Sequence, residues 1–272
     1  MAQRSSTTRL DNATAPGSLA PRPVVLVLDY PGQRPEAMLS ELRLEDAGFD
    51  VRYLLVRPLP QELSAEKYAQ GALKAAGDIS GGVHAVLAYC MSAALAPYVA
   101  TLASAEHLLL FDAERSTAKT VADELQSILR SFNSADTLPD WWCGETLKVS
   151  PATLLERINS HLFDAIRAAL AADSDPSVDE GQDQVTDQVA RSMVRTYMDW
   201  FSHLVAAHGH APESFNGPWN AAHIVSDGHV LPDGWRGVAC LPRHTVETSR
   251  RELARADETQ SLALRLLQQP LT

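Results

Sequence analysis

Short apolar segments alternate with amphipathic ones through the first 114 residues of the chain. The first of them, 24–28 (VVLVL), is apolar at every position, which is typical of a strand covered on both faces of a parallel sheet. A helical pattern begins after Ser64, a favourable N-cap residue, and ends before Gly77. The alternation predicts an α/β protein with a mostly parallel central sheet. The predicted strands are 24–28, 49–56, 83–89 and 107–111, and the predicted helices are 35–47, 64–76 and 92–103.

From about residue 115 the periodicity is helical only, and strand patterns return near the end of the chain. A helical block between the fourth strand and a C-terminal strand–helix unit has the arrangement of a lid over a site. A separate helical domain would give the same pattern. The expected parts are a flexible N-terminal tail (1–21), an α/β core (22–114 and 215–272) and a helical lid (115–214). The further predicted elements are helices 117–130, 151–171, 181–207 and 246–268 and strands 223–225 and 238–241.

Composition and charge narrow the class of protein. The 272 residues are 45% hydrophobic and 21% charged, as in an ordinary globular chain. With 34 acidic and 23 basic residues the net charge is −11, which argues against a broad surface for nucleic acid or an anionic membrane. No apolar run approaches the roughly 20 residues that a membrane span needs. We therefore expect a soluble, cytoplasmic protein, with a mobile acidic loop at 173–183.

The three cysteines fit neither a disulfide framework nor a paired zinc motif, but one of them has an unusual setting. Cys90 lies in the segment Ala88-Tyr89-Cys90-Met91-Ser92, where a predicted strand turns into a predicted helix. In a nucleophile elbow, the positions two before and two after the reactive residue must be small, because the two backbones crowd there. The residues Ala88 and Ser92 meet that requirement, and the helix dipole would favour a thiolate. The alternative is that Cys90 is a buried, inert apolar residue.

On these motifs the chain resembles the thioesterase branch of the α/β-hydrolases, enzymes that release acyl chains from polyketide and nonribosomal peptide assembly lines. The resemblance covers about residues 23–114 and 219–268. It departs from the family in the Cys that replaces Ser, in the loss of both elbow glycines, and in Pro-Arg-His-Thr where the family has Gly-x-His-Phe. The matching segments are Tyr30-Pro31-Gly32-Gln33, Ala88 to Ala93, Leu109-Leu110-Phe111-Asp112 and Pro242-Arg243-His244.

The resemblance implies an α/β-hydrolase fold with a helical lid insertion, and a role for each site residue. Cys90 would be the nucleophile, His244 its base and Asp112 the acid that orients the imidazole. The backbone N–H groups of Met91 and Gln33 would hold the oxyanion. Asp227 is a rival for the acid, because some hydrolases carry it after the penultimate strand.

A Cys nucleophile brings the chain closest to the thioesterase-like Dieckmann cyclases, which close tetramic acid or pyridone rings. Transfer of an acyl chain from a phosphopantetheine carrier protein to Cys90 would keep the chain activated as a thioester, so that an internal carbon nucleophile can attack it. The first alternative is a hydrolytic or macrocyclising thioesterase or acyltransferase. The second is a relative that binds acyl groups without catalysis. None of these functions implies a cofactor or a metal.

Two further groups of residues receive a structural interpretation. The aromatic stripe of the predicted lid, which includes Trp200 and Phe201, has the helical spacing of packing residues. The histidines His203, His208 and His210 have no carboxylate at ligand spacing, so we expect a solvated helix end rather than a metal site.

Overall fold

The computed structural model describes residues 22–31, 36–79, 82–134, 137–172, 181–208, 217–231 and 235–270. The tail predicted at 1–21 and the first part of the loop predicted at 173–183 lie outside these residues. Within them, no helix combines the length and the apolar composition that crossing a membrane would require.

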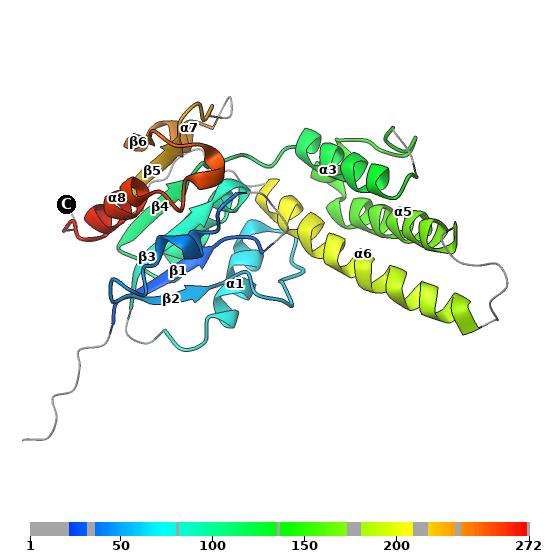
Figure 1. Cartoon of the computed structure of the whole chain (residues 1–272), viewed down its shortest axis with the longest axis horizontal. Helices are drawn as coiled ribbons and strands as arrows, with labels where there is room; N and C mark the ends of the chain where they lie inside the picture. Colours follow the sequence, from blue (N-terminus) through cyan, green and yellow to red (C-terminus); the bar gives the residue numbers. More distant parts are fainter. Residues whose placement is uncertain are drawn as a thin grey trace, which may run out of the picture.

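Six parallel strands form one sheet in the order β2-β1-β3-β4-β5-β6 (Figure 1). With helices on both faces and a helical segment inserted after β4, this is an α/β-hydrolase fold, and the predicted fold class is confirmed. Because every strand runs the same way, the loops after β3, β4, β5 and β6 all leave from one edge of the sheet, which is where such folds place their sites. The strands are β1 Val24–Leu28, β2 Asp50–Tyr53, β3 Val83–Tyr89, β4 His107–Phe111, β5 Asn220–Ser226 and β6 Arg243–Val246.

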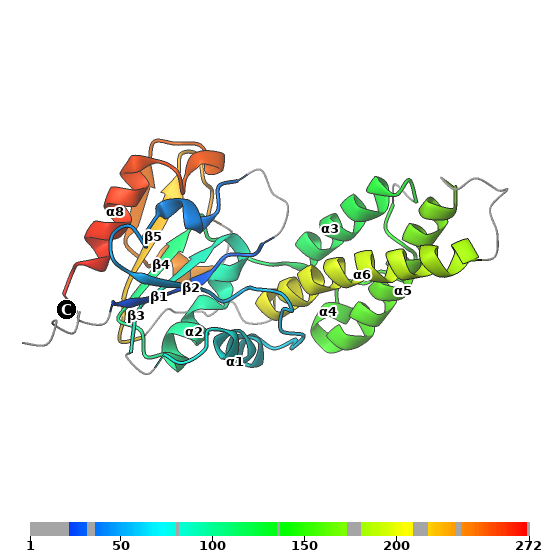
Figure 2. The same ribbon diagram turned by 60° about the horizontal axis from the view of Figure 1, so that its bottom comes forward.

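The continuous apolar strands follow from the two cores that cover them. Leu26 belongs to the core beneath α1 (Ala65–Ala75) and α2 (Ala96–Leu102), whereas Val27 belongs to the core beneath α8 (Asp257–Leu267). Successive side chains of a strand point to opposite faces, so both faces need apolar residues. Figure 2 shows α8 on one side of the sheet and α1 and α2 on the other.

The helices inserted after β4 have a hydrophobic core of their own, and the aromatic stripe belongs to it, with Phe201 fully buried. The block lies beside the sheet, and α6 runs from it back to the sheet (Figure 2). Its two ends meet at Ser116, which donates from Oγ to the Leu204 carbonyl (2.8 Å) and accepts at its own carbonyl from His208 Nδ1 (3.1 Å). The helices are α3 Ala118–Ser131, α4 Thr146–Val149, α5 Pro151–Ala172 and α6 Gly181–His208.

The C-terminal elements differ from the predicted ones. The strand predicted at 238–241 is partly a helix, α7 (Arg236–Ala239), and the last strand is Arg243–Val246. A short apolar run does not distinguish a buried helical turn from a strand, and at this sheet edge only Val246 of β6 is buried. The helix predicted at 246–268 is divided into η3 (Arg250–Glu252) and α8.

The helix predicted at 35–47 is also shorter than expected. Its described part contains a single 3-10 turn, η1 (Leu39–Leu42), followed by hydrogen-bonded turns up to Gly48. The two leucines of η1 are buried against the sheet. The apolar periodicity therefore predicted correctly that this segment packs on the core, but not that it forms a 3-10 turn.

Candidate active site

Cys90 occupies a strained turn between β3 and a 3-10 helix, η2 (Cys90–Ala94). Its backbone φ is 54°, in the left-handed region that residues other than glycine rarely adopt. Ala88 and Ser92, two positions to either side, are both buried. Cys90 therefore has the backbone geometry of a nucleophile elbow.

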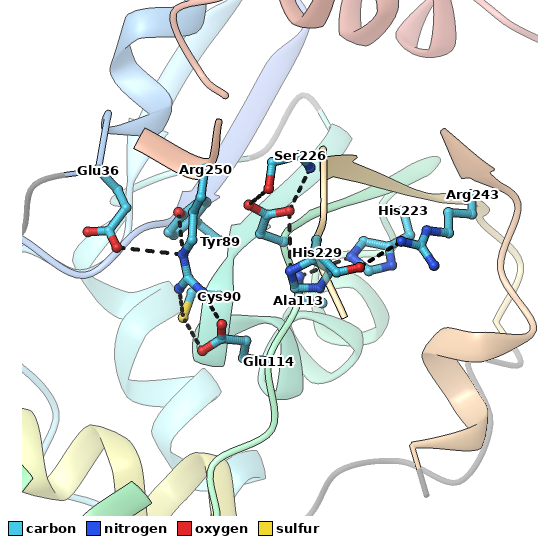
Figure 3. A network of polar contacts seen from close by, with 11 residues as sticks. Glu36, Tyr89, Cys90, Ala113, Glu114, His223, Ser226, His229, Arg243 and Arg250 are labelled. Carbon is cyan, nitrogen blue, oxygen red and sulfur yellow. Dashed lines mark hydrogen bonds and ion pairs between the residues drawn. The ribbon is translucent and has the colours of Figure 1, made fainter. Parts of the chain in front are cut away.

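The Cys90 thiol lies between a carboxylate and a guanidinium (Figure 3). Its Sγ atom donates to Glu114 Oε2 at 3.3 Å and accepts from Arg250 Nη2 at 3.2 Å. Arg250 and Glu114 also form an ion pair with each other. Glu114 follows β4, and its backbone N–H donates to the Cys90 carbonyl at 3.2 Å, whereas Arg250 begins η3 after β6. Loops from three strands therefore meet at one sulfur atom.

Arg250 is held by groups other than Cys90 and Glu114. Its Nε atom donates to the Tyr89 hydroxyl at 3.3 Å and lies 3.5 Å from Glu36 Oε1. The guanidinium carbon is 5.8 Å from the centroid of the Tyr89 ring. Two carboxylates and an aromatic face thus fix the position of the cation beside the thiol.

This environment keeps the thiol of Cys90 protonated at rest. Burial, and after it the negative charge of Glu114, raise the pKa of the Cys90 thiol to about 12 against the opposing effects of Arg250 and a backbone hydrogen bond from Met91. At neutral pH the sulfur is therefore a thiol that donates to Glu114.

The expected Cys90–His244–Asp112 triad is not assembled among the described residues. His244 lies inside β6, paired with Ile224, which is paired in turn with Phe111 of β4 and through it with Tyr89. At about 4.8 Å per strand, three spacings put His244 roughly 14 Å from the end of β3. The base was expected from the loop after the last strand. Because that strand lies further along the chain than predicted, the loop contains Arg250.

The two candidate acids have other partners. Asp112 is fully buried and accepts from the backbone N–H of Ser226 (2.8 Å) and from its hydroxyl (2.7 Å), so that it joins the ends of β4 and β5. Its Oδ1 atom also lies 3.5 Å from His229 Nδ1. Asp227 is exposed, and its backbone N–H donates to Thr248.

Sequence reasoning missed Glu114, Arg250 and His229. Glu114 lies two residues beyond the acid that was singled out, and Asp112 itself has a positive φ of 40°, which turns the chain after β4. Arg250 lies among the charges of Ser249-Arg250-Arg251-Glu252, which resemble a solvated helix surface. Of the two expected oxyanion donors, Met91 directly follows Cys90, and Gln33 lies outside the described residues.

The C-terminal end of α6 packs against the turn that carries Cys90. His203 is fully buried and bridges Ser92 Oγ (3.1 Å from Nε2) and the Tyr68 hydroxyl (3.3 Å from Nδ1). Burial lowers the pKa of His203 to about 3. The predicted solvated helix end is therefore wrong at this position, because α6 packs its last turns against η2. Of the other two histidines, His208 binds Ser116 and His210 lies outside the described residues.

A cavity of about 910 Å³ separates the segment after β2 from helices α5 and α6. Three arginines line it, together with apolar side chains such as Phe163 and Met198. One lining residue, Asp199, is four residues before His203, or about 6 Å along the helix. The cavity is therefore connected to the elbow through α6, and Cys90 is not among its lining residues. Its arginines are Arg57, Arg191 and Arg195.

No protein-family model matches the sequence, and no curated protein matches it. Similar solved structures are α/β-hydrolases, and they include thioesterase domains. A 2-hydroxy-6-oxo-6-phenylhexa-2,4-dienoate hydrolase from Rhodococcus sp. strain RHA1 is 12% identical, with a TM-score of 0.48 and 91% of each chain covered. The Vlm2 thioesterase domain is 15% identical (TM-score 0.45; 90% of this chain and 92% of that one), and the NocB thioesterase domain is 14% identical (0.42; 91% and 96%). At these identities the likeness concerns the fold, and the function has to be argued from the site.

Proposed function

We propose that this chain is an acyl-transfer enzyme that takes an acyl group from a thioester onto Cys90. The observation that carries the proposal is the position of the thiol. It lies on a strained strand-to-helix turn, between a carboxylate that accepts its proton and a guanidinium that stabilises negative charge on sulfur. A nucleophile needs a base within hydrogen-bond reach, and Glu114 meets that requirement in place of His244.

The first half-reaction exchanges one thioester for another. As Sγ attacks the thioester carbonyl, the thiol proton passes to Glu114 Oε2, and the tetrahedral oxyanion lies near the Met91 N–H. Collapse breaks the bond to the leaving sulfur, which takes the proton back from Glu114. The products are an acyl group on Cys90 and a free thiol, so protons and electrons balance. Arg250 pairs with Glu114 and offsets the charge that develops on both sulfurs.

The second half-reaction is proposed to be a Dieckmann condensation that forms a tetramic acid or pyridone ring. Glu114 removes a proton from the acidic carbon between two carbonyl groups of the bound chain. The carbanion attacks the thioester carbonyl, a C–C bond forms, and the bond to Cys90 breaks. The Cys90 sulfur then recovers the proton from Glu114. The choice of Cys supports this outcome over hydrolysis, because a thioester intermediate remains reactive toward carbon nucleophiles.

The donor is proposed to be an acyl chain on a phosphopantetheine carrier protein. The 910 Å³ cavity supports this donor, because its apolar side chains suit an acyl chain and its arginines suit a phosphate. Arg191 also packs over the Phe163 ring, with 5.0 Å between the guanidinium carbon and the ring centroid.

The test is intact-protein mass spectrometry after mixing with a β-ketoamide pantetheine thioester, with the Cys90→Ala variant as control. The expected result is a protein heavier by the acyl group, or rapid release of pantetheine, together with a cyclic product that contains no added water. Both should require Cys90. A free acid formed with the same dependence would support the hydrolytic alternative. Turnover that persists in Cys90→Ala would overturn the proposal.

A further inference from the structure

His84, Glu106 and His107 lie together at the edge of the sheet opposite the elbow. They occupy the starts of β3 and β4, which pair from Ala85 and His107 onward. One ligand atom from each of the three residues lies within 4.8 Å of the others. His84 is six residues from Cys90 along β3, or roughly 20 Å, so this cluster takes no part in the chemistry at the thiol.

Both ring nitrogens of His84 have hydrogen-bond partners. Nε2 lies 2.8 Å from the carbonyl oxygen of Leu267, at the end of α8, and a carbonyl can only accept, so Nε2 carries a proton. Nδ1 lies 2.8 Å from Glu106 Oε2, so the two side chains form an ion pair when Nδ1 is also protonated, and a metal ion bound here would take the place of that proton. A histidine that donates one N–H to a carbonyl and turns its other nitrogen toward a carboxylate has the arrangement of a metal ligand with its supporting partner.

The burial of His107 is a second observation that points to a bound ion. Its side chain is 2% exposed, and its Nδ1 atom is buried without a hydrogen-bond partner among the described residues. The His84 and His107 ring centroids are 4.8 Å apart. An unsatisfied buried nitrogen is costly, and a metal ion within this cluster would satisfy it.

We propose that His84, Glu106 and His107 bind one divalent transition-metal ion, with Zn²⁺ as the best match. Two imidazoles and one carboxylate are a common three-ligand set for zinc, which leaves a position for water or a small ligand. That position faces a cavity of about 450 Å³ lined by Phe49, Gln268 and Gln269 among others. Bonds of about 2.1 Å put ligand atoms roughly 3–3.5 Å apart, so rotation of the side chains is enough to close around the ion.

The ion would fasten together parts of the chain that are distant in sequence. It would join the starts of β3 and β4 directly, and through the His84–Leu267 hydrogen bond it would hold the last turn of α8. Metal bound to the folded state alone stabilises that state by mass action. The expected consequence is greater stability and order at this edge, with no change in the reactivity of Cys90.

The test measures Zn²⁺ binding to the full chain after chelator treatment, with free thiols capped by iodoacetamide so that exposed Cys143 and Cys240 cannot bind the ion. Isothermal titration with ZnCl₂ should give one ion per chain. Thermal unfolding should show a higher melting temperature with the ion bound. Glu106→Gln keeps the size of a half-exposed side chain and should weaken binding by at least about tenfold. The matched control is Glu66→Gln, which removes an exposed carboxylate of α1 and should bind as the wild type does.

A second variant, His84→Gln, guards against misfolding as the cause of any loss, and circular dichroism verifies the fold of each variant. Co²⁺ in place of Zn²⁺ should give visible absorption bands that disappear in Glu106→Gln. Absence of stoichiometric Zn²⁺ binding, or equal affinity in the wild type and Glu106→Gln, would overturn the proposal.

Discussion

Arg250 donates a hydrogen bond from Nη2 to the Sγ atom of Cys90 at 3.2 Å, across 160 residues of sequence. A guanidinium is permanently charged and cannot accept a proton. In the place where a histidine would act as both base and acid, this chain therefore has a group that can only stabilise negative charge. The transfer of the proton is left to Glu114, which contacts both residues.

Replacement of Glu114 by Gln should change thiol reactivity and acyl transfer in opposite directions. Loss of the negative charge removes one cause of the raised pKa of Cys90, so alkylation of Cys90 by iodoacetamide near pH 8 should become faster. Loss of the base should slow acyl transfer by about 10²–10⁴-fold. Peptide mapping gives the first rate and pantetheine release the second.

The control for Glu114→Gln is Asp227→Asn, which removes an exposed carboxylate at the same sheet edge and should leave both rates near those of the wild type. If Glu114→Gln moved the alkylation rate and the transfer rate in the same direction, Glu114 would not be the proton acceptor.

His244→Ala and Arg250→Leu form the second comparison. The sequence resemblance predicts that loss of His244 is severe. The structure places that side chain within β6, so His244→Ala should retain acyl transfer within about threefold, because substitutions remote from the reacting atoms remove no transition-state contact. Arg250→Leu should lose transfer and raise the pKa of Cys90 further. Rates are compared at equal folded fraction. A severe defect in His244→Ala would contradict a site formed by Cys90, Glu114 and Arg250.

The arginines of the large cavity should distinguish acyl donors that carry a phosphate group from acyl donors that lack one. Replacement of both Arg191 and Arg195 by Gln should raise the KM for a phosphopantetheine thioester by about tenfold for each charge-assisted contact that is lost. The KM for an N-acetylcysteamine thioester, which has no phosphate, should be unchanged. Equal effects on both donors would show that the cavity does not recognise the phosphate.

Stability should fall as the pH drops below about 6.5. His223 of β5 is fully buried, and its Nε2 atom accepts from the Ala113 N–H at 3.0 Å. Burial lowers the pKa of His203, and likewise that of His223, to about 3, whereas the unfolded chain binds these protons near pH 6.5. Each histidine should therefore cost about 1.4 kcal/mol of unfolding free energy per pH unit between pH 6.5 and 3, and nothing above pH 6.5. Urea unfolding at several pH values measures this slope. His203→Gln should reduce it, and an undiminished slope in that variant would exclude His203 as a source.

Apolar periodicity predicted β1, β3 and β4 closely because both faces of these strands are buried, so that nearly every residue is apolar. The edge strand β6 has one buried residue, Val246, and carries little of that signal. The error there displaced the loop that was expected to supply the base. Fully buried strands were therefore predictable, whereas the signal of β6 was too weak to place that strand along the chain.

The candidate site was predictable as far as the turn that carries Cys90 and the edge of the sheet on which this turn lies. The side chains that reach Cys90 could not be predicted, because they depend on how the loops after β4 and β6 turn. The positive φ of Asp112 directs that residue toward Ser226 and brings Glu114 to the sulfur. The order of residues along the chain does not show which side chain of a loop will reach Cys90.

The contacts of Ser116 with Leu204 and His208 close the inserted helices into a loop whose ends touch. Such an insertion can be lengthened, shortened or exchanged as a cassette, since the sheet is joined to it at neighbouring points. The link between His203 and Ser92 sets one condition, because any replacement must return a partner to the turn that carries Cys90. Diversity of substrates in proteins built this way can therefore arise by exchange of whole helical segments while the turn at Cys90 stays in place.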